Sequence, residues 1–244
     1  MNKMEAFSVT DIGRKRSVNQ DYVFCSTDAI GAFPNLFIVA DGMGGHNAGD
    51  YASRFCVETF VEMIRASSER TPIRRIEKAI PDTNELLRKR SSEDESLAGM
   101  GTTFVLCTVL EKVIYVANIG DSRLYMIDDS GIEQITVDHS LVEEMVRNGE
   151  IDRREARFHP NKNVITRALG VTKNVIPDFF ELDVREGSSL LLCSDGLSNM
   201  VEDEEIRRIV RAYPNDIRRA AQELVDRANE NGGRDNIAIV LIQL

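Results

Sequence analysis

The sequence lacks any run of about 18 apolar residues that could cross a membrane, and it lacks repeats and low-complexity tracts. Its Gly and Pro content is low, with 16 and 6 residues, which excludes a collagen-like chain. Hydrophobic residues (42%) and charged residues (29%) occur in ordinary proportions, which excludes a disordered one. The amino terminus has no apolar run of signal-peptide length. We therefore expect a folded, cytoplasmic protein with no membrane contact.

The chain also lacks an excess of positive charge. Forty Asp and Glu residues against thirty Lys and Arg residues give a formal net charge of -10. A surface of that sign repels phosphate backbones. We therefore expect no nucleic acid partner.

Cysteines are few and show no CxxC spacing, which argues against a disulfide framework. The four cysteines are Cys25, Cys56, Cys107 and Cys193, and most of them lie in apolar runs. We expect buried free thiols in a reducing compartment.

Short runs rich in β-branched, aromatic and leucine side chains predict strands. They cover residues 22–26, 36–40, 103–110, 113–119, 123–127, 189–194 and 237–242. The gaps at 111–112, 120–122 and 128–131 are too short for a parallel crossover, so we expect antiparallel hairpins at these three places.

Helical patterns lie between the strand groups. Helices are expected over 47–66, from Thr71-Pro72 toward Arg90, from Asp203, and from about Asn215 to Gly232. Thr71 followed by proline is typical of a helix N-cap, and Pro81 predicts a kink or break. Strand clusters that alternate with helix pairs favour an α+β layered domain with helices outside antiparallel sheets.

The segment from His139 to Lys162 is polar and charged, with few residues suited to a core. It is either a solvated helical connection or a lid over a site. No linker divides the chain, so we expect one domain over residues 1–244, with an excursion at about 140–163.

Five aspartates lie at the ends of predicted strands. They are Asp21, Asp41, Asp121, Asp195 and Asp235. Turn chemistry explains any one of them, especially the Asp-Gly pairs at 41–42 and 195–196. However, strand ends in a layered sheet gather along one edge, where carboxylates repel each other unless a cation neutralises them.

The types of ligand indicate the metal. Carboxylate oxygens and the Gly42 carbonyl are hard ligands, which suit Mg²⁺ or Mn²⁺, and no thiolate or imidazole cluster favours zinc. Two such ions about 3.5–4 Å apart activate water and stabilise an in-line displacement at phosphorus. The aspartates therefore point to phosphoryl hydrolysis.

A basic cluster, Arg14, Lys15 and Arg16, precedes Asp21. Such a cluster is commonly solvated surface. Beside a two-metal site, however, a guanidinium can hold a phosphate through two parallel hydrogen bonds, and Arg16 is the candidate. His46 follows the Asp41 turn and is either a titrating group of the site or a surface or capping residue.

Eight motifs, taken together and in order, resemble the metal-dependent protein phosphatases of the protein phosphatase 2C (PPM) class in their compact bacterial form. They are TDIGRKRSVNQD (10–21), VADGMGGHNAG (39–49), GMGTT (99–103), ANIGDSR (117–123), DHS (138–140), ITRALG (165–170), LLCSDGLSN (191–199) and GRDN (233–236). The match runs from about Thr10 to Leu244.

The resemblance implies an α-β-β-α layered sandwich of two antiparallel sheets flanked by helix pairs, with a metal centre at one edge. It implies removal of phosphate from phosphoserine and phosphothreonine of proteins by direct attack of a metal-bridging water, without a phosphoenzyme. The implied cofactors are two Mn²⁺ or Mg²⁺ ions, with a weaker third ion in bacterial members. Residues 140–163 coincide with the flap that borders the substrate channel.

The resemblance also implies a ligand set. Asp41 corresponds to the carboxylate that bridges both ions, and Gly42 offers its carbonyl to the second. Asp195 and Asp235 correspond to ligands of the first ion. Asp121, together with Asp195, matches the position that holds the third ion.

Other positions of the family pattern carry further expectations. Asp21 acts through metal-bound water, and Arg16 falls on the phosphate-binding arginine. Met43 stands where animal members carry a histidine proposed as general acid, so the leaving oxygen takes its proton from elsewhere. Asn199 replaces an aspartate that binds the third ion in some relatives. The expected catalytic residues are Arg16, Asp41 and Asp195.

The sequence thus favours a monomeric, cytoplasmic signalling enzyme that opposes a bacterial Ser/Thr protein kinase and acts on phosphorylated proteins, including that kinase. A non-catalytic scaffold that binds phosphoproteins is an alternative, but it predicts the loss of metal ligands. A two-metal nuclease has suitable chemistry, but the net charge of -10 argues against it.

Overall fold

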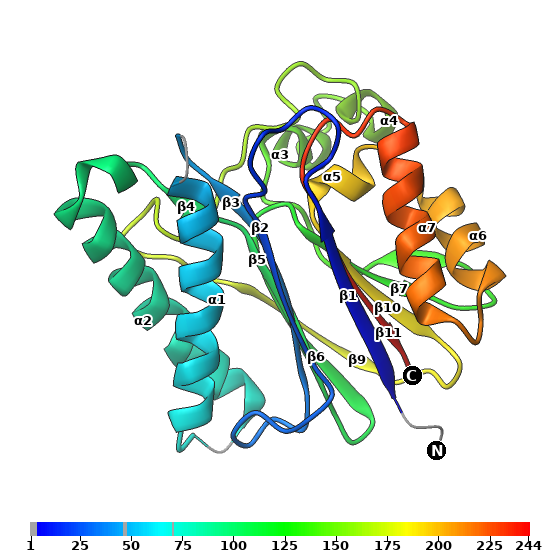
Figure 1. Ribbon diagram of the computed structural model, residues 1–244, viewed down its shortest axis with the longest axis horizontal. Helices are drawn as coiled ribbons and strands as arrows, with labels where there is room; N and C mark the ends of the chain where they lie inside the picture. Colours follow the sequence, from blue (N-terminus) through cyan, green and yellow to red (C-terminus); the bar gives the residue numbers. More distant parts are fainter. Residues whose placement is uncertain (1–3, 46–47, 70) are drawn as a thin grey trace.

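The computed structural model describes residues 4–45, 48–69 and 71–244 (Figure 1). Its strands are β1 (Glu5–Asp11), β2 (Asp21–Ser26), β3 (Leu36–Met43), β4 (Gly101–Thr102), β5 (Phe104–Leu110), β6 (Val113–Ile119), β7 (Arg123–Ile127), β8 (Ile132–Gln134), β9 (Asp178–Asp183), β10 (Ser189–Cys193) and β11 (Ile237–Gln243). Its helices are α1 (Ala48–Ala66), α2 (Pro72–Glu93), α3 (Leu141–Arg147), α4 (Arg153–Ala156), α5 (Asp195–Ser198), α6 (Asp203–Ala212) and α7 (Ile217–Glu230), with a 3₁₀ helix η1 at Glu95–Leu97.

The strands form two antiparallel sheets. One sheet has the order β1-β11-β10-β7-β8, and the other has the order β2-β3-β5-β6-β9 with the short β4 paired to β3. The first and last strands lie side by side, because β1 pairs with β11 from Glu5 opposite Gln243 to Asp11 opposite Ile237. The loop that leaves β1 and the loop that enters β11 therefore meet at neighbouring strand ends.

The two sheets face each other, and helices cover their outer faces (Figure 1). Helices α1 and α2 pack on the sheet that contains β3, while α6 and α7 pack on the sheet that contains β11. Between the sheets, Val39 and Val105 of one meet Leu192 and Val240 of the other in a third apolar cluster. This arrangement confirms the predicted α-β-β-α layered sandwich.

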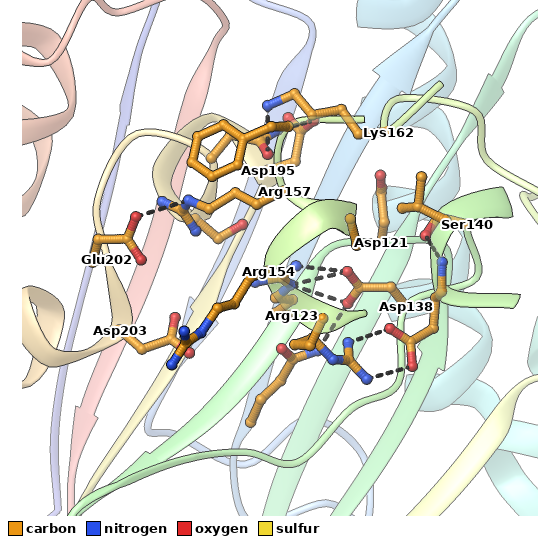
Figure 2. Close-up of a pocket in the computed structure, with 18 of the residues that line it drawn as sticks. Asp121, Arg123, Asp138, Ser140, Arg154, Arg157, Lys162, Asp195, Glu202 and Asp203 are labelled. Carbon is orange, nitrogen blue, oxygen red and sulfur yellow. Dashed lines mark hydrogen bonds and ion pairs between the residues drawn. The ribbon is translucent and has the colours of Figure 1, made fainter. Parts of the chain in front are cut away.

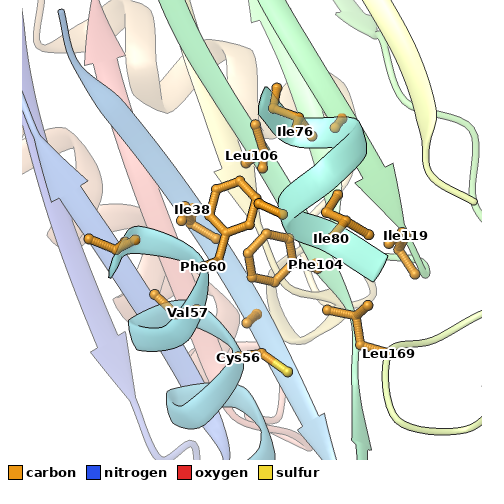
Figure 3. Packing of buried hydrophobic residues seen from close by; sticks show 14 of the residues in the cluster. Ile38, Cys56, Val57, Phe60, Ile76, Ile80, Phe104, Leu106, Ile119 and Leu169 are labelled. Carbon is orange, nitrogen blue, oxygen red and sulfur yellow. The ribbon is translucent and has the colours of Figure 1, made fainter. Parts of the chain in front are cut away.

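Figure 3 shows the apolar layer beneath α1 and α2. Phe60 of α1 packs edge-on against Phe104 of β5, with ring centroids 5.2 Å apart. Both side chains are buried. Such aromatic pairs add stability beyond the apolar area that they bury.

All seven predicted strands are present, and the hairpin turns at 111–112 and 128–131 are confirmed. The sequence patterns missed β4, which has only two residues, and the edge strands β1, β8 and β9. An edge strand contacts water along one side and carries polar side chains, so its apolar pattern is weak.

The hairpin expected across 120–122 is wrong, because β6 and β7 belong to different sheets. Gly120 makes the crossing with a φ of 103°, a left-handed conformation that favours glycine. Its N–H donates to His139 Nδ1, and its carbonyl accepts from the His139 N–H, each at 3.0 Å. The short loop thus passes from one sheet to the other, where a two-stranded turn was expected.

The helix predictions hold apart from the break at Pro81. Thr71 caps α2 by accepting from the Arg74 N–H at 3.4 Å, and Asp216 caps α7 by accepting from the Arg219 N–H at 3.0 Å. Helix α2 runs through Pro81 without a break, and because this residue is exposed, water can solvate the carbonyl left unpaired one turn earlier. None of the helices in the described ranges has the length and apolar character of a membrane span.

Candidate active site

The five predicted aspartates come from strand ends that meet at one end of the sandwich. Asp21 and Asp41 are direct cross-strand partners on β2 and β3. Asp195 follows β10 and Asp235 precedes β11, and these two strands are antiparallel neighbours. Asp121 follows β6 in the loop that crosses between the sheets. The fold therefore brings these five residues to the same end of the sandwich.

The electrostatics of the site show that these carboxylates act on one another. Burial raises the pKa of Asp41 well above its ordinary value, and the charges of Asp21, Asp195, Asp121 and Asp235 raise it further. All four other aspartates thus lie within electrostatic range of Asp41.

Three further carboxyl groups have pKa values that are shifted in the same direction. Burial, and to a lesser extent the charges of Asp195 and Asp235, raises the pKa of Asp21 to about 7 despite a hydrogen bond from Ser194. Burial and the charge of Asp235 raise the pKa of Asp195 to about 6. Burial likewise raises the pKa of Asp121. The protein alone leaves these negative charges poorly compensated.

Unpaired buried oxygen atoms of the site are available to bind a cation. Asp21, Asp121 and Asp195 each have a buried Oδ1 atom without a hydrogen-bond partner. No group of three or more His, Cys, Asp or Glu side chains in the described part of the chain already stands as a ready ligand set. The donor set fits hard divalent cations such as Mg²⁺ and Mn²⁺.

The backbone of Gly42 is packed closely against neighbouring backbone segments. A Cβ atom at this position would lie 2.0 Å from the Gly49 carbonyl oxygen and 2.6 Å from that of Gln20, so only glycine fits. The neighbouring Asp41 N–H donates to Thr103 Oγ1 at 2.9 Å, and the Asp41 carbonyl accepts from the Thr103 N–H at 2.9 Å. The predicted ligand pair Asp41 and Gly42 thus sits on a rigid strand end.

Arg16 lies in the site, as the sequence predicted. Its Nη2 donates to Asp235 Oδ2 at 2.7 Å, and its side chain remains 48% exposed. The hydrogen bond to Asp235 raises the pKa of Arg16, and the charges of Asp235, Asp41 and Asp195 raise it further. We call the five aspartates of the site the acidic floor. The Arg16 guanidinium lies between this acidic floor and solvent, where it can bind a phosphate group.

A pocket of about 600 Å³ opens beside Asp121 and Asp195 (Figure 2). Segment 140–163 borders it with α3, α4 and the loop that follows. Arg123 and Asp138 also line the pocket, and the Arg123 guanidinium donates to both carboxylate oxygens of Asp138 at 2.7 to 3.1 Å. The pocket thus connects the acidic cluster to the excursion that the sequence analysis singled out.

Polar contacts tie the excursion to the site. Lys162 Nζ donates to Asn199 Oδ1 at 3.2 Å, and Asn199 Nδ2 donates to Asp195 Oδ2 at 2.9 Å. Arg157 Nε pairs with Glu202 at 2.9 Å, as Figure 2 shows. Asn199, expected as a departure at the third-ion position, therefore orients Asp195 through its side-chain amide.

Sequence reasoning missed two residues that hold the site together, Ser194 and Asn236. Ser194 Oγ donates to Asp21 Oδ2 at 2.7 Å. The Asn236 side chain accepts from the Gln20 N–H at 2.9 Å and donates to the Val18 carbonyl at 3.0 Å. Both residues lie inside motifs of the family pattern, LLCSDGLSN and GRDN, but the motifs do not indicate these contacts.

Two of the three histidines accept hydrogen bonds from backbone N–H groups, and the prediction for the third, His46, stays open. His139 is buried and accepts from the Gly120 N–H, and His159 accepts from the Asn161 N–H at 3.2 Å. His46 lies outside the described residues. Met43, where animal members carry a histidine, ends β3 opposite Gly101.

Comparison with known proteins identifies the family. The profile of the family described as protein phosphatase 2C matches residues 12–241. The chain belongs to the protein phosphatase 2C family. It is 38% identical to the serine/threonine phosphatase stp of Listeria monocytogenes, over 98% of this chain and 96% of that protein.

Solved structures of the family have the same fold. The chain matches serine/threonine phosphatase Stp1 from Staphylococcus aureus with a TM-score of 0.91 and 35% identity, covering 99% of this chain and 95% of that one. It also matches the catalytic domain of PstP in complex with two manganese ions, with a TM-score of 0.85 and 31% identity over 98% and 97% of the two chains. The predicted family and fold are therefore confirmed.

Proposed function

We propose that this chain is a metal-dependent protein phosphatase that hydrolyses phosphoserine and phosphothreonine in proteins. The convergence of Asp21, Asp41, Asp121, Asp195 and Asp235 at one end of the sandwich, with unpaired buried oxygens, carries the proposal. A phosphatase also requires a group that binds the substrate phosphate. Arg16 supplies such a group, because it is a cation that lies beside this cluster and is exposed to solvent. Membership in the protein phosphatase 2C family supports the same activity.

Two Mn²⁺ or Mg²⁺ ions would be held by Asp41, the Gly42 carbonyl, Asp195 and Asp235, and Asp121 would join Asp195 in holding a weaker third. When bound, such ions lower the pKa of water and neutralise charge that develops at phosphorus. The catalytic domain of PstP, which was solved in complex with two manganese ions, supports this assignment.

The side chains of the protein contribute binding and orientation. Arg16 binds phosphate oxygens through its guanidinium, which places the phosphorus over the acidic floor. Asp21, held by Ser194, orients water at the edge of the cluster. Asn199 fixes the rotamer of Asp195. Water attacks phosphorus directly, so the bond from phosphorus to the serine oxygen breaks as the new one forms, and no side chain is phosphorylated.

The remaining proposals concern context. We assign residues 140–163 as a flap on a single catalytic domain spanning residues 1–244, because this segment borders the pocket and reaches Asn199 and Glu202 through Lys162 and Arg157. The enzyme acts as a cytoplasmic monomer that opposes a Ser/Thr protein kinase in signalling. Its substrates are phosphorylated proteins, including that kinase.

The experiment that tests this function is hydrolysis of p-nitrophenyl phosphate and of a phosphoserine peptide, with and without added Mn²⁺ or Mg²⁺. We expect Asp41→Asn to reduce kcat by at least about a hundredfold, because it removes charge from the centre of the cluster. Asp183→Asn is the matched control, since Asp183 is exposed at the far end of β9.

Activity that persists in excess chelator, or that survives Asp41→Asn, contradicts the proposal. Calorimetry with Mn²⁺ separates the enzyme from a non-catalytic scaffold. Uptake of metal without hydrolysis of either substrate would favour the scaffold.

A further inference from the structure

Two loops at the mouth of the site are locked to each other. One loop joins β1 to β2, and the other joins α7 to β11. The Arg14 and Lys15 N–H groups both donate to the Gly233 carbonyl, at 2.7 and 3.1 Å. The loops lie side by side at the site end of the sandwich (Figure 1). They form one surface although about 200 residues separate them in the chain.

Glycines make this close approach possible. Gly13 has a φ of 80°, and a Cβ atom there would lie 2.2 Å from the Asp235 carbonyl oxygen. Gly233 has a φ of 49°, and a Cβ atom there would lie 2.8 Å from the Arg14 nitrogen. Asn236 adds a side-chain bond to the Ile12 carbonyl at 2.9 Å. The loops are therefore held in one conformation.

This locked surface presents three cations, Arg14, Lys15 and Arg234, which we call the basic rim. All three are exposed. Within the described residues, none of their side chains forms a hydrogen bond or ion pair, whereas their neighbour Arg16 is paired with Asp235. A chain with a net charge of -10 thus keeps three uncompensated cations beside its acidic site.

The rim extends toward the flap. Burial lowers the pKa of Lys162, and the positive charges of Arg157, Arg234 and Arg123 lower it further, against the opposite effect of Asp195. Arg234 is therefore within electrostatic range of the flap. Cations border the acidic floor on the side of the two locked loops and on the side of the flap.

We propose that the basic rim selects substrates, by binding a second anionic group next to the phosphorylated residue. This inference rests on the proposed phosphatase function. Arg14 and Lys15 are within two residues of Arg16, and Arg234 adjoins Asp235. The basic rim is therefore adjacent to the proposed phosphate-binding residue. An extended peptide advances about 3.3–3.6 Å per residue, so side chains one to three positions from the phosphoserine reach the rim. The group is a carboxylate or a second phosphoryl group.

The test compares three peptides that differ only at the positions flanking one phosphoserine. They carry Gln, Glu, or a non-hydrolysable phosphonate residue. The readout is the ratio of kcat/KM between an anionic peptide and the Gln peptide, because a general loss of activity cancels in this ratio. The rim variant is Lys15→Gln with Arg234→Gln. Its matched control is Lys112→Gln with Arg208→Gln, which removes the same charge at exposed positions elsewhere.

We expect the wild type to prefer at least one anionic peptide by about fivefold, from two exposed charge contacts. The preference should arise in KM, weaken with salt, and disappear in the rim variant but not in the control. A preference for Glu identifies a carboxylate, and a preference for the phosphonate alone identifies a second phosphoryl group. Either result supports the rim.

Equal kcat/KM for all three peptides, or an equal loss of preference in the control variant, overturns the rim. Hydrolysis of p-nitrophenyl phosphate by the wild type shows separately whether the phosphatase function stands. If the wild type hydrolyses none of the substrates, the dissociation constants of the same three peptides, labelled and measured by fluorescence anisotropy, still test the rim. The proposal requires tighter binding of an anionic peptide than of the Gln peptide.

Discussion

Ser194 and Asp21 connect the two sheets at the site. The Ser194 hydroxyl donates to Asp21 Oδ2 at 2.7 Å and accepts from the Ala238 N–H at 2.9 Å. Ser194 follows β10 of one sheet, and Asp21 begins β2 of the other. One buried hydroxyl thus joins a candidate site carboxylate to the backbone of β11, and a change there should affect both stability and the site.

We expect Ser194→Ala to lower the free energy of unfolding by about 1–3 kcal/mol, because it leaves a buried carboxylate oxygen and a backbone N–H without partners. The melting temperature should fall by about 2–4 °C per kcal/mol. Mn²⁺ affinity, measured by calorimetry, should fall as well. Ser188→Ala is the control, since Ser188 is also buried and its hydroxyl donates to the Arg185 carbonyl at the other end of β10. Equal losses of Mn²⁺ affinity in the two variants would contradict the assignment.

The contribution of Ser194 shows what the sequence could not predict. Strand-end aspartates predicted the acidic cluster because apolar runs fix where strands end, and antiparallel strands bring these ends together. Hydrogen bonds between distant segments leave no such pattern, so the links from Ser194 to Asp21 and from Asn236 to Gln20 were missed.

The strands of the fold also differ in whether the sequence could predict them. Central strands carry continuous apolar runs and were all predicted, whereas the edge strands β1, β8 and β9 were not. The short 120–122 gap predicted a hairpin, because loop length does not show whether the next strand joins the same sheet. Tertiary contacts of Gly120 with His139 decide this crossing.

The metal-free protein should lose stability as the pH rises from about 5 to 8. The pKa values of Asp21 and Asp195 are raised to about 7 and about 6, from 3.8. In this range the folded state therefore binds more protons than the unfolded state, and the free energy of unfolding falls with pH. Added Mn²⁺ should reverse the trend, because ionised carboxylates bind the metal. Differential scanning fluorimetry in chelator and in Mn²⁺ measures both effects.

A variant isolates this carboxylate effect from other titrations. Burial lowers the pKa of His139, whose protonation acts in the opposite direction below pH 6.5. Asp195→Asn should flatten the decline in melting temperature, and Asp183→Asn should leave it unchanged. A melting temperature that stays constant or rises from pH 5 to 8 in chelator for the wild type, with the same profile in Asp195→Asn, would refute the uncompensated acidic cluster.

Arg16→Lys should reduce kcat/KM for a phosphoserine peptide by about tenfold to a hundredfold. Lysine keeps the charge but cannot form two parallel hydrogen bonds to a phosphate, and one charge-assisted bond contributes about 1.5–3 kcal/mol. Steady-state kinetics in saturating Mn²⁺ measure the effect. Arg54→Lys, at an exposed position of α1, serves as control. Unchanged kinetics in Arg16→Lys would remove Arg16 from the phosphate site.

The four free cysteines should be almost inert in the folded protein. Cys56, Cys107 and Cys193 are buried, and burial raises the pKa of each thiol. Cys25 is partly exposed, although burial raises its pKa also. Because the thiolate is the reactive form, a disulfide reagent at pH 8 should modify at most one thiol slowly, and all four after unfolding in guanidinium chloride.

Cys25→Ser tests this assignment, because it should abolish the slow reaction of the folded protein while three thiols still react after unfolding. Cys107 lies on β5, next to β3, whose far end carries Asp41. Modification of Cys107 would therefore require separation of the strands that position the site. Rapid labelling of two or more thiols without loss of the folded state would show that the sheets open in solution, contrary to the packing between them.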